Sequence, residues 1–268
     1  MKVSIFLAHL EELAVQKNCS EAAALREAKR AGIDYVEVDY KTSVGHEAEL
    51  KAKLDNAGLQ VGGVNTFFDF GHQPQPELIE SAVDTAQKLG AALIMAVPGF
   101  MEPGDEWPTL REKLAGGLTR LCSAGAERGV TVAMEDFGSD TAPYGRMHEL
   151  DWMLHQVPGL GCTLDTGNFL YFGEDVLKAY DLLEKRIVHV HMKDITFAPL
   201  RGEKGLKALT GKTLYPAPVG SGELPIAEIV RRLYEHGYDG LCAIEHYDAG
   251  DQLLYMRRSA RWLKNIFR

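Results

Sequence analysis

The sequence predicts a (β/α)8 barrel, an α/β fold, formed as a single domain over residues 1–268. Three observations lead to it: a length of 268 residues that suits one barrel, a helix–glycine–strand pattern that recurs along the chain, and eight apolar segments with amphipathic stretches between them. An open, doubly wound sheet is the alternative, but no G-x-G-x-x-G motif follows an early strand. We therefore expect eight parallel strands alternating with helices.

Six of the strands are preceded by a glycine at the end of a helix. Glycine favours the left-handed conformation that terminates helices, and the runs after these glycines are rich in Val, Ile, Leu and Ala, as in strands buried on both faces. The other two strands are the opening KVSIFLAHL and the segment IVHVHMKD. The six glycines are Gly32, Gly58, Gly90, Gly129, Gly159 and Gly237.

Helices are expected between the strands, the first of them capped by Ser20 and ending near Gly32. The segment 195–222 is rich in glycine and proline, which predicts an irregular loop over one face of the barrel and makes it a candidate lid. The remaining helices are expected near 50–57, 79–89, 106–128, 146–156, 174–184, 225–236 and 251–267.

Composition narrows the classes of function. The chain has 29 Lys and Arg against 38 Asp and Glu, a net charge of −9, which argues against general nucleic-acid binding but leaves a small anionic substrate open. No run of eighteen apolar residues exists to span a membrane, so we expect a soluble, cytoplasmic protein. The four cysteines form no C-x-x-C pair and are expected to be free thiols, mostly buried.

Polar residues gather at the carboxyl ends of the last four strands, where barrel enzymes carry their active sites. Side chains alternate along a strand, so His191 shares a face with Lys193 and lies nearer the strand end than His189, which is expected one layer deeper. The candidate ligands are Glu135 in VTVAMEDF, Asp165 in GCTLDTGN, His191 in IVHVHMKD and Glu245 in LCAIEHYD.

Three converging carboxylates repel one another unless a cation lies between them. Three carboxylates with one imidazole suit a single divalent ion; we expect Mn²⁺, and Co²⁺, Mg²⁺ or Zn²⁺ fit the same donors. The alternative is a barrel that only binds or scaffolds, for which four polar strand ends in succession would be accidental.

The segments MEDF, LDTGN, HVHMKD, PVGSGELPI and AIEHYD resemble the sugar phosphate isomerase/epimerase superfamily, the xylose isomerase-like barrels. This resemblance implies that Glu135, Asp165, His191 and Glu245 hold the metal. It also implies that Glu37, in the segment VEVDY, lines the substrate pocket.

The resemblance further implies an isomerase or epimerase of a small sugar, sugar phosphate or cyclic polyol. In such an enzyme Glu135 and Glu245 would move a proton next to a metal-bound carbonyl. A lyase or dehydratase acting on a keto-sugar or inosose is the main alternative. A hydrolase like endonuclease IV is disfavoured by the net charge and by the shortage of clustered histidines.

Three more residues are candidates for binding substrate. Lys193 is a candidate donor to a developing oxyanion, with an ion pair to Asp194 as the structural alternative. Asn168 stands where the resembling ketose 3-epimerases carry histidine, and it cannot act as an acid or base. Trp107 lies in a loop with Pro and Gly neighbours. Two questions stay open: whether the PVGSGE turn offers N–H groups to an anion, and whether the chain forms a homo-oligomer.

Overall fold

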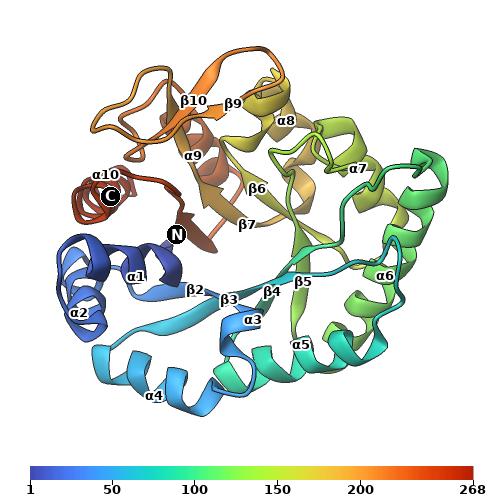
Figure 1. Cartoon of the computed structure of the whole chain (residues 1–268), viewed down its shortest axis with the longest axis horizontal. Coiled ribbons are helices and arrows are strands. Elements are labelled where there is room, and N and C mark those ends of the chain that lie inside the picture. The colour runs from blue at the N-terminus through green and yellow to red at the C-terminus, as the bar shows by residue number, and fades with distance from the viewer. Residues whose placement is uncertain (268) are drawn as a thin grey trace.

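The computed structural model describes residues 1–267 and contains a closed barrel of eight parallel strands (Figure 1). The order around the barrel is β1-β11-β7-β6-β5-β4-β3-β2, so each strand lies beside its neighbours along the chain. The predicted (β/α)8 fold class is confirmed. The barrel strands are β1 (Lys2–Phe6), β2 (Tyr35–Asp39), β3 (Gln60–Phe67), β4 (Leu93–Val97), β5 (Thr131–Met134), β6 (Gly161–Asp165), β7 (Ile187–Met192) and β11 (Leu241–Ile244).

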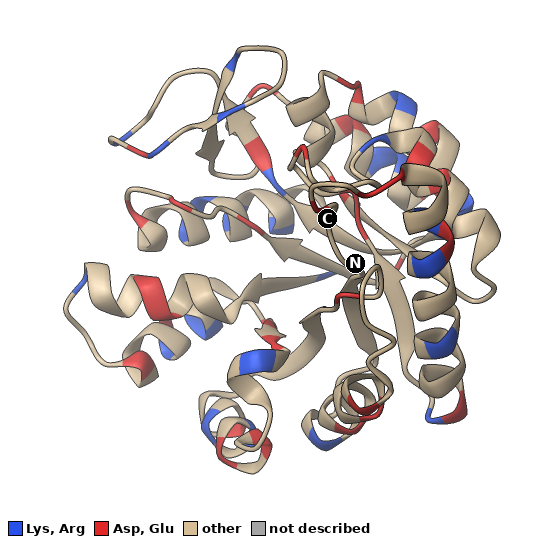
Figure 2. Ribbon diagram, turned by 45° about the vertical axis from the view of Figure 1, so that its right-hand side comes forward, with Lys and Arg blue, Asp and Glu red and all other residues tan. Residues whose placement is uncertain are grey.

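Helices surround the barrel, and Figure 2 shows that basic and acidic residues alternate over them while the barrel strands carry few. The Ser20 side chain accepts a hydrogen bond from the N–H of Ala23, and Gly32 ends the same helix with φ of 79°, as predicted. The main helices are α1 (Leu7–Gln16), α2 (Glu21–Ala31), α3 (Tyr40–Ser43), α4 (Glu47–Ala57), α5 (Pro76–Leu89), α6 (Trp107–Glu127), α7 (Met147–Gln156), α8 (Val176–Leu183), α9 (Ile226–Glu235) and α10 (Gln252–Ile266).

The amino-terminal segment departs from the prediction. The run KVSIFLAHL is not one strand, because β1 ends at Phe6 and α1 begins at Leu7. Leu7, Leu10 and Leu13 recur at helical spacing and are all buried, so the helix gains its core contacts through these side chains. Two helices, α1 and α2, therefore follow the first strand.

The segment 195–222 is more ordered than the expected irregular loop. It forms, with Asp194, a small antiparallel sheet in the order β8-β10-β9, in which Pro216 pairs with Ile195 and Leu214 with Leu206. This sheet follows β7 directly and lies apart from the barrel strands in Figure 1. Its strands are β8 (Asp194–Thr196), β9 (Leu206–Lys207) and β10 (Thr213–Ala217).

The alternation predicted for the seventh strand is confirmed. Val190 and Met192 belong to the apolar core, whereas the buried rings of His189 and His191 lie beside carboxylates, 3.6 Å from Glu37 and 2.7 Å from Glu135. Three cysteines are buried and Cys19 is exposed, and all four are free thiols. Over residues 1–267, no helix is both long enough and apolar enough to cross a membrane.

Candidate metal centre and substrate cavity

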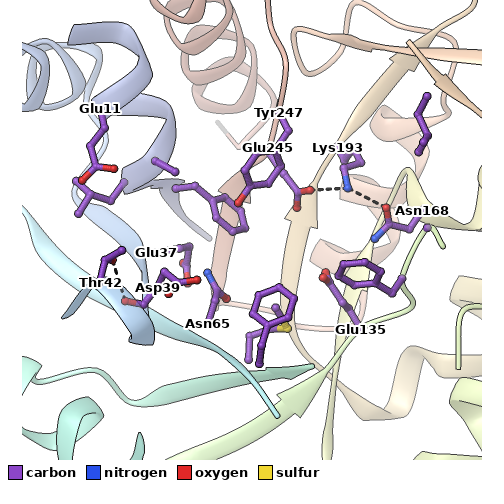
Figure 3. Close-up of a pocket in the computed structure, with 18 residues that line it drawn as sticks. Glu11, Glu37, Asp39, Thr42, Asn65, Glu135, Asn168, Lys193, Glu245 and Tyr247 are labelled. Carbon is purple, nitrogen blue, oxygen red and sulfur yellow. Dashed lines mark hydrogen bonds and ion pairs between the residues drawn. The ribbon is translucent and has the colours of Figure 1, made fainter. Parts of the chain in front are cut away.

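A cavity of about 580 Å³ lies where the barrel strands end, and residues within or directly after seven of the eight barrel strands line it (Figure 3). Its wall mixes carboxylates and amides with aromatic rings. The lining residues are Phe6, Leu7, Ala8, Glu11, Glu37, Asp39, Thr42, Asn65, Phe67, Met95, Glu135, Phe137, Gly138, Asn168, Lys193, Leu206, Glu245 and Tyr247.

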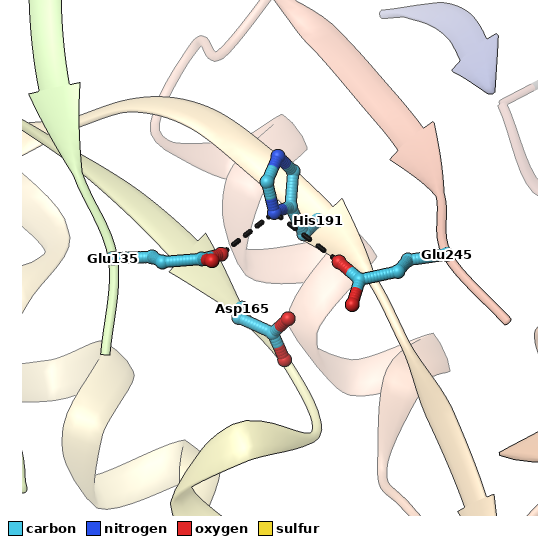
Figure 4. A group of neighbouring side chains, drawn as sticks. All are labelled: Glu135, Asp165, His191 and Glu245. Atoms are coloured by element: carbon cyan, nitrogen blue, oxygen red, sulfur yellow. Dashed lines mark hydrogen bonds and ion pairs between the residues drawn. The ribbon is translucent and has the colours of Figure 1, made fainter. Parts of the chain in front are cut away.

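The four predicted metal ligands converge at this cavity. One ligand atom from each of Glu135, Asp165, His191 and Glu245 lies within 4.8 Å of the others, and all four residues are buried. Asp165 pairs with His191 across β6 and β7, and Ala243 pairs with His191 across β11 and β7. This register brings the strand ends to one height, so their polar side chains meet (Figure 4).

Hydrogen bonds show which atoms face the centre. Nδ1 of His191 lies 2.7 Å from Oε2 of Glu135 and 3.3 Å from Oε2 of Glu245. Oδ1 of Asp165 accepts the backbone N–H groups of Gly167 and Asn168, at 2.7 and 2.8 Å. These two bonds fix the Asp165 carboxylate and leave its Oδ2 free to coordinate an ion.

The Lys193 ammonium belongs to the same cluster. It donates to Oδ1 of Asn168 at 2.8 Å, pairs with Glu245, and lies 3.2 Å from Oδ2 of Asp165. Asn168 in turn donates from Nδ2 to the backbone carbonyl of Asp136 at 2.9 Å, so both ends of its amide are held. Lys193 and Asn168 thus form one wall of the cavity, as Figure 3 shows.

Asp194 does not pair with Lys193, so the structural alternative considered for Lys193 is wrong. Its carboxylate instead accepts the N–H groups of Gly220 and Gly222, each at 2.9 Å, and those of Ile195 and Leu224. The N–H groups of the PVGSGE turn are therefore directed at an anion, but that anion is a side chain of the protein itself.

Burial and neighbouring charges shift the pKa values at the centre. Burial lowers the pKa of His191 and Lys193, but the carboxylates around them outweigh this effect and hold both pKa values well above their usual range. For Glu245, burial raises the pKa, but Lys193 and His191 dominate and lower it. Burial raises the pKa of Asp165 to about 7. These shifts show carboxylates that need nearby positive charge to stay ionised.

A second polar layer lies deeper in the barrel. Oε1 of Glu37 accepts a hydrogen bond from Oγ of Ser4 at 2.8 Å and lies 3.6 Å from Nε2 of His189. The His189 ring meets the His191 ring edge to face, with centroids 5.1 Å apart. Burial raises the pKa of Glu37 and lowers that of His189. His189 thus lies below His191, where the strand alternation predicted it.

Trp107 is not brought to the cavity. It begins α6, where its ring packs 6.4 Å from that of Trp152 and under the guanidinium of Arg111. Its position gives no support to a role in substrate binding. The other candidates, Glu37, Asn168 and Lys193, all line the cavity.

Sequence reasoning missed five polar or aromatic residues of the wall, namely Phe6, Glu11, Asp39, Thr42 and Asn65. Asp39 ends β2 and Asn65 lies near the end of β3, so the strand-end rule applied to the last four strands would have found them in the early ones too. Glu11 lies on α1, which the sequence had not separated from the first strand.

Comparison with known proteins agrees with the fold. The model of the xylose isomerase-like TIM barrel family matches residues 25–266. The chain belongs to this family. A protein of Streptomyces coelicolor provisionally named hydroxypyruvate isomerase is 26% identical over 228 residues, covering 75% of this chain and 74% of that protein.

Other relatives differ in the reaction that they are named for. A protein of Escherichia coli provisionally named L-ribulose-5-phosphate 3-epimerase is 24% identical and covers 94% of this chain and 93% of its own. The inosose dehydratase of Lacticaseibacillus casei is 29% identical over 146 residues, which span 53% of this chain and about half, 47%, of that enzyme. The relatives therefore include proteins named as an isomerase, an epimerase and a dehydratase.

Solved structures share the fold over nearly the whole chain. The IOLI protein with a bound zinc atom has a TM-score of 0.74 and 17% identity, covering 99% of this chain and 98% of its own. An L-ribulose 3-epimerase has a TM-score of 0.75 and 14% identity, covering 99% and 94%.

Proposed function

We propose that this chain is a divalent-metal-dependent isomerase or epimerase of a small sugar, sugar phosphate or cyclic polyol. The observation that carries the proposal is the convergence of three carboxylates and one imidazole within 4.8 Å, beside a cavity of about 580 Å³. The isomerase and epimerase named among the relatives support the same class of reaction.

The donor atoms fit a divalent ion. Oxygen donors with one imidazole suit Mn²⁺, which we expect, and also Co²⁺, Mg²⁺ or Zn²⁺. Oδ2 of Asp165 is fully buried and, within residues 1–267, accepts no hydrogen bond; the Lys193 ammonium lies 3.2 Å away as an ion-pair partner, and a divalent ion would supply the further positive charge at this oxygen. The zinc named in the IOLI structure supports a divalent ion in this fold.

When bound, such an ion would polarise a substrate carbonyl and so acidify the neighbouring C–H group. Glu135 and Glu245 approach the centre from opposite sides in Figure 4. One carboxylate would take the proton from that carbon, and the other would return it to the opposite face or to the neighbouring atom. The substrate then leaves as its epimer or isomer, with no net gain or loss of atoms.

Lys193 and Asn168 would orient the substrate. The Lys193 ammonium lines the cavity and can donate a hydrogen bond to an oxygen on which negative charge develops. Asn168 carries no titratable group, so it can hold a hydroxyl but cannot move a proton. Proton transfer is therefore assigned to the two glutamates.

A lyase or dehydratase is the second candidate, supported by the inosose dehydratase among the relatives. The same carboxylate would remove the proton, and a hydroxyl on the adjacent carbon would leave as water after protonation. The two reactions share the first step and differ in the fate of the electron pair.

Deuterium incorporation tests both candidates. Purified protein supplied with Mn²⁺ is incubated in D₂O with free ketoses, ketose phosphates and inososes, and the products are followed by NMR and ultraviolet absorption. We expect deuterium at one carbon of an epimer or isomer; a new absorbing, unsaturated product would identify the lyase instead. Glu245→Gln should stop either reaction, whereas Glu127→Gln, at the exposed end of α6, should not. A protein that binds no divalent ion and exchanges no proton would contradict the proposal.

A further inference from the structure

The wall of the cavity is strongly acidic. Glu11, Glu37, Asp39, Glu135 and Glu245 all line it, and Asp165 lies within 4.8 Å of the last two through its ligand atom. These carboxylates outnumber the positive charge that one divalent ion and one lysine supply. An anionic substrate would therefore enter a negative field.

Lys193 has little charge to offer to an anion. Among the lining residues from the described part of the chain it is the sole Lys or Arg, and its ammonium already contacts Glu245, Asp165 and Asn168. Lys204 lines a smaller neighbouring cavity of about 140 Å³ together with Lys193 and Asp248. Because the charge of Lys193 is already engaged by Glu245 and Asp165, the charges left at this smaller cavity are Lys204 and Asp248, which offset each other. Neither lysine makes a site with the surplus positive charge that phosphate needs.

Backbone N–H groups do not supply that site either. Those of Gly220, Gly222 and Leu224 are donated to the Asp194 carboxylate. Helix α1 begins at the cavity with Leu7, but Glu11, one turn later, lines the same cavity and places a carboxylate near the amino-terminal end of the helix. The first set of N–H groups is thus already bonded to a carboxylate, and the amino-terminal end of α1 has a carboxylate one turn away.

Two buried groups of the wall lack hydrogen-bond partners. Oε2 of Glu37 and Oδ1 of Asn65 have none within residues 1–267, although these residues are only 1% and 6% exposed. A hydroxyl group both donates and accepts, so it can serve an amide oxygen and a carboxyl group in either protonation state. An ionised phosphate or carboxylate only accepts, and it has no proton to offer to the Asn65 oxygen.

The barrel makes room for Glu37 in particular. A Cβ atom at Gly63 would lie 2.4 Å from Oε2 of Glu37, and one at Gly62 would lie 3.0 Å from Oε1. Two consecutive glycines in β3 therefore allow the carboxyl group to lie inside the barrel beside Asn65, where Ser4 holds its other oxygen. The position is built into the fold and is not a flexible surface contact.

We propose that the substrate of this site is an uncharged polyhydroxy ketone, and that phosphorylated and carboxylated sugars are excluded. Its hydroxyl groups meet Glu37 and Asn65, and its C–H faces lie against Phe67 and Tyr247, whose side chains are exposed at the cavity. This inference rests on the proposed function and selects one substrate class within it.

Matched pairs of ligands test the inference on metal-loaded wild-type protein. Initial rates and calorimetric binding are measured for D-fructose against D-fructose 6-phosphate, D-xylulose against D-xylulose 5-phosphate, and dihydroxyacetone against hydroxypyruvate. We expect the neutral member of each reactive pair to have at least about tenfold higher kcat/KM or affinity. Preference for the charged member, or binding of neither member of any pair, overturns the inference. Metal content and deuterium exchange test the proposed function separately, so an enzyme active on phosphates alone would refute only the substrate class.

Three variants test which residues set the preference for a neutral substrate. Asn65→Leu and Glu37→Gln should weaken binding of the neutral ligand about tenfold while one divalent ion per chain is retained, because neither residue belongs to the four-ligand centre. Glu11→Lys, at an exposed position, should shift the neutral-to-phosphate ratio of kcat/KM about tenfold toward the phosphate. If binding of the neutral ligand and the neutral-to-phosphate ratio of kcat/KM were unchanged in all three variants, these residues would not set the specificity.

Discussion

Nδ1 of His191 lies 2.7 Å from Oε2 of Glu135, although 56 positions separate the two residues in the chain. The contact defines which imidazole nitrogen faces the centre and gives the ring one orientation. Nε2 points away from the carboxylates, and within the described chain it has no hydrogen-bond partner. A divalent ion at this centre would therefore be held through Nδ1.

Replacing one ligand at a time should remove the ion without unfolding the barrel. In Asp165→Asn the remaining amide oxygen can still accept the N–H groups of Gly167 and Asn168, so the turn is kept while a ligand charge is lost. We expect this variant and His191→Ala to bind Mn²⁺ at least about tenfold more weakly than wild type, measured by elemental analysis and calorimetry. Circular dichroism checks folding, and wild-type affinity in both folded variants would rule out the assigned centre.

Metal affinity should depend on pH through Asp165. Burial raises its pKa to about 7, and the carboxyl group must lose its proton to bind an ion. Below pH 7 the proton competes with the ion, so the apparent affinity for Mn²⁺ should fall by about fivefold between pH 7 and pH 6 and approach a tenfold loss for each further pH unit. Above pH 7 this dependence should level off. Calorimetry in buffers of different ionisation enthalpy would count the released proton, and an affinity constant from pH 5 to pH 8 would disprove the effect.

Adjacent glycines in α6 should respond to alanine in opposite directions. A Cβ at Gly117 would lie 2.1 Å from the ring of Phe70, whereas a Cβ at Gly116 meets its nearest neighbour, Arg120, at 3.8 Å. We expect Gly117→Ala to lower the free energy of unfolding by about 1–3 kcal/mol through overpacking. Gly116→Ala should raise it by roughly 0.5–1 kcal/mol, since alanine favours the helix. Urea unfolding measures both, and equal effects would mean that Phe70 yields without cost.

Asp194 should stabilise the segment that follows β7. Its carboxylate accepts four backbone N–H groups and is 1% exposed, so Asp194→Ala leaves several donors without an acceptor. We expect a loss of about 2 kcal/mol or more in the free energy of unfolding and faster proteolysis within 195–224. Asp194→Asn keeps one acceptor oxygen and should lose less. If both variants matched wild type, water would be replacing these hydrogen bonds without penalty.

Much of the site could be predicted because a parallel barrel brings all strand ends to one rim. Glu135, Asp165, His191 and Glu245 follow from the strand pattern and that rule alone, and their convergence needs no knowledge of distant packing. The same rule was not applied to β2 and β3, so Asp39 and Asn65 were missed although their sequence signal was present.

The sequence by itself determined the barrel, most of its helices and the residue types at four strand ends, because these depend on periodicity and on local turn chemistry. Tertiary structure alone decided the partners. In the folded chain Asp194 accepts the N–H groups of Gly220 and Gly222, and Lys193 pairs with the carboxylates of the centre. Trp107 packs on Trp152, away from the cavity. Tertiary structure also decided that β1 ends at Phe6, since the apolar run through Leu7 suits a strand and a helix alike. A side chain's partner depends on which distant segments the closed barrel places beside it, and no local pattern records that.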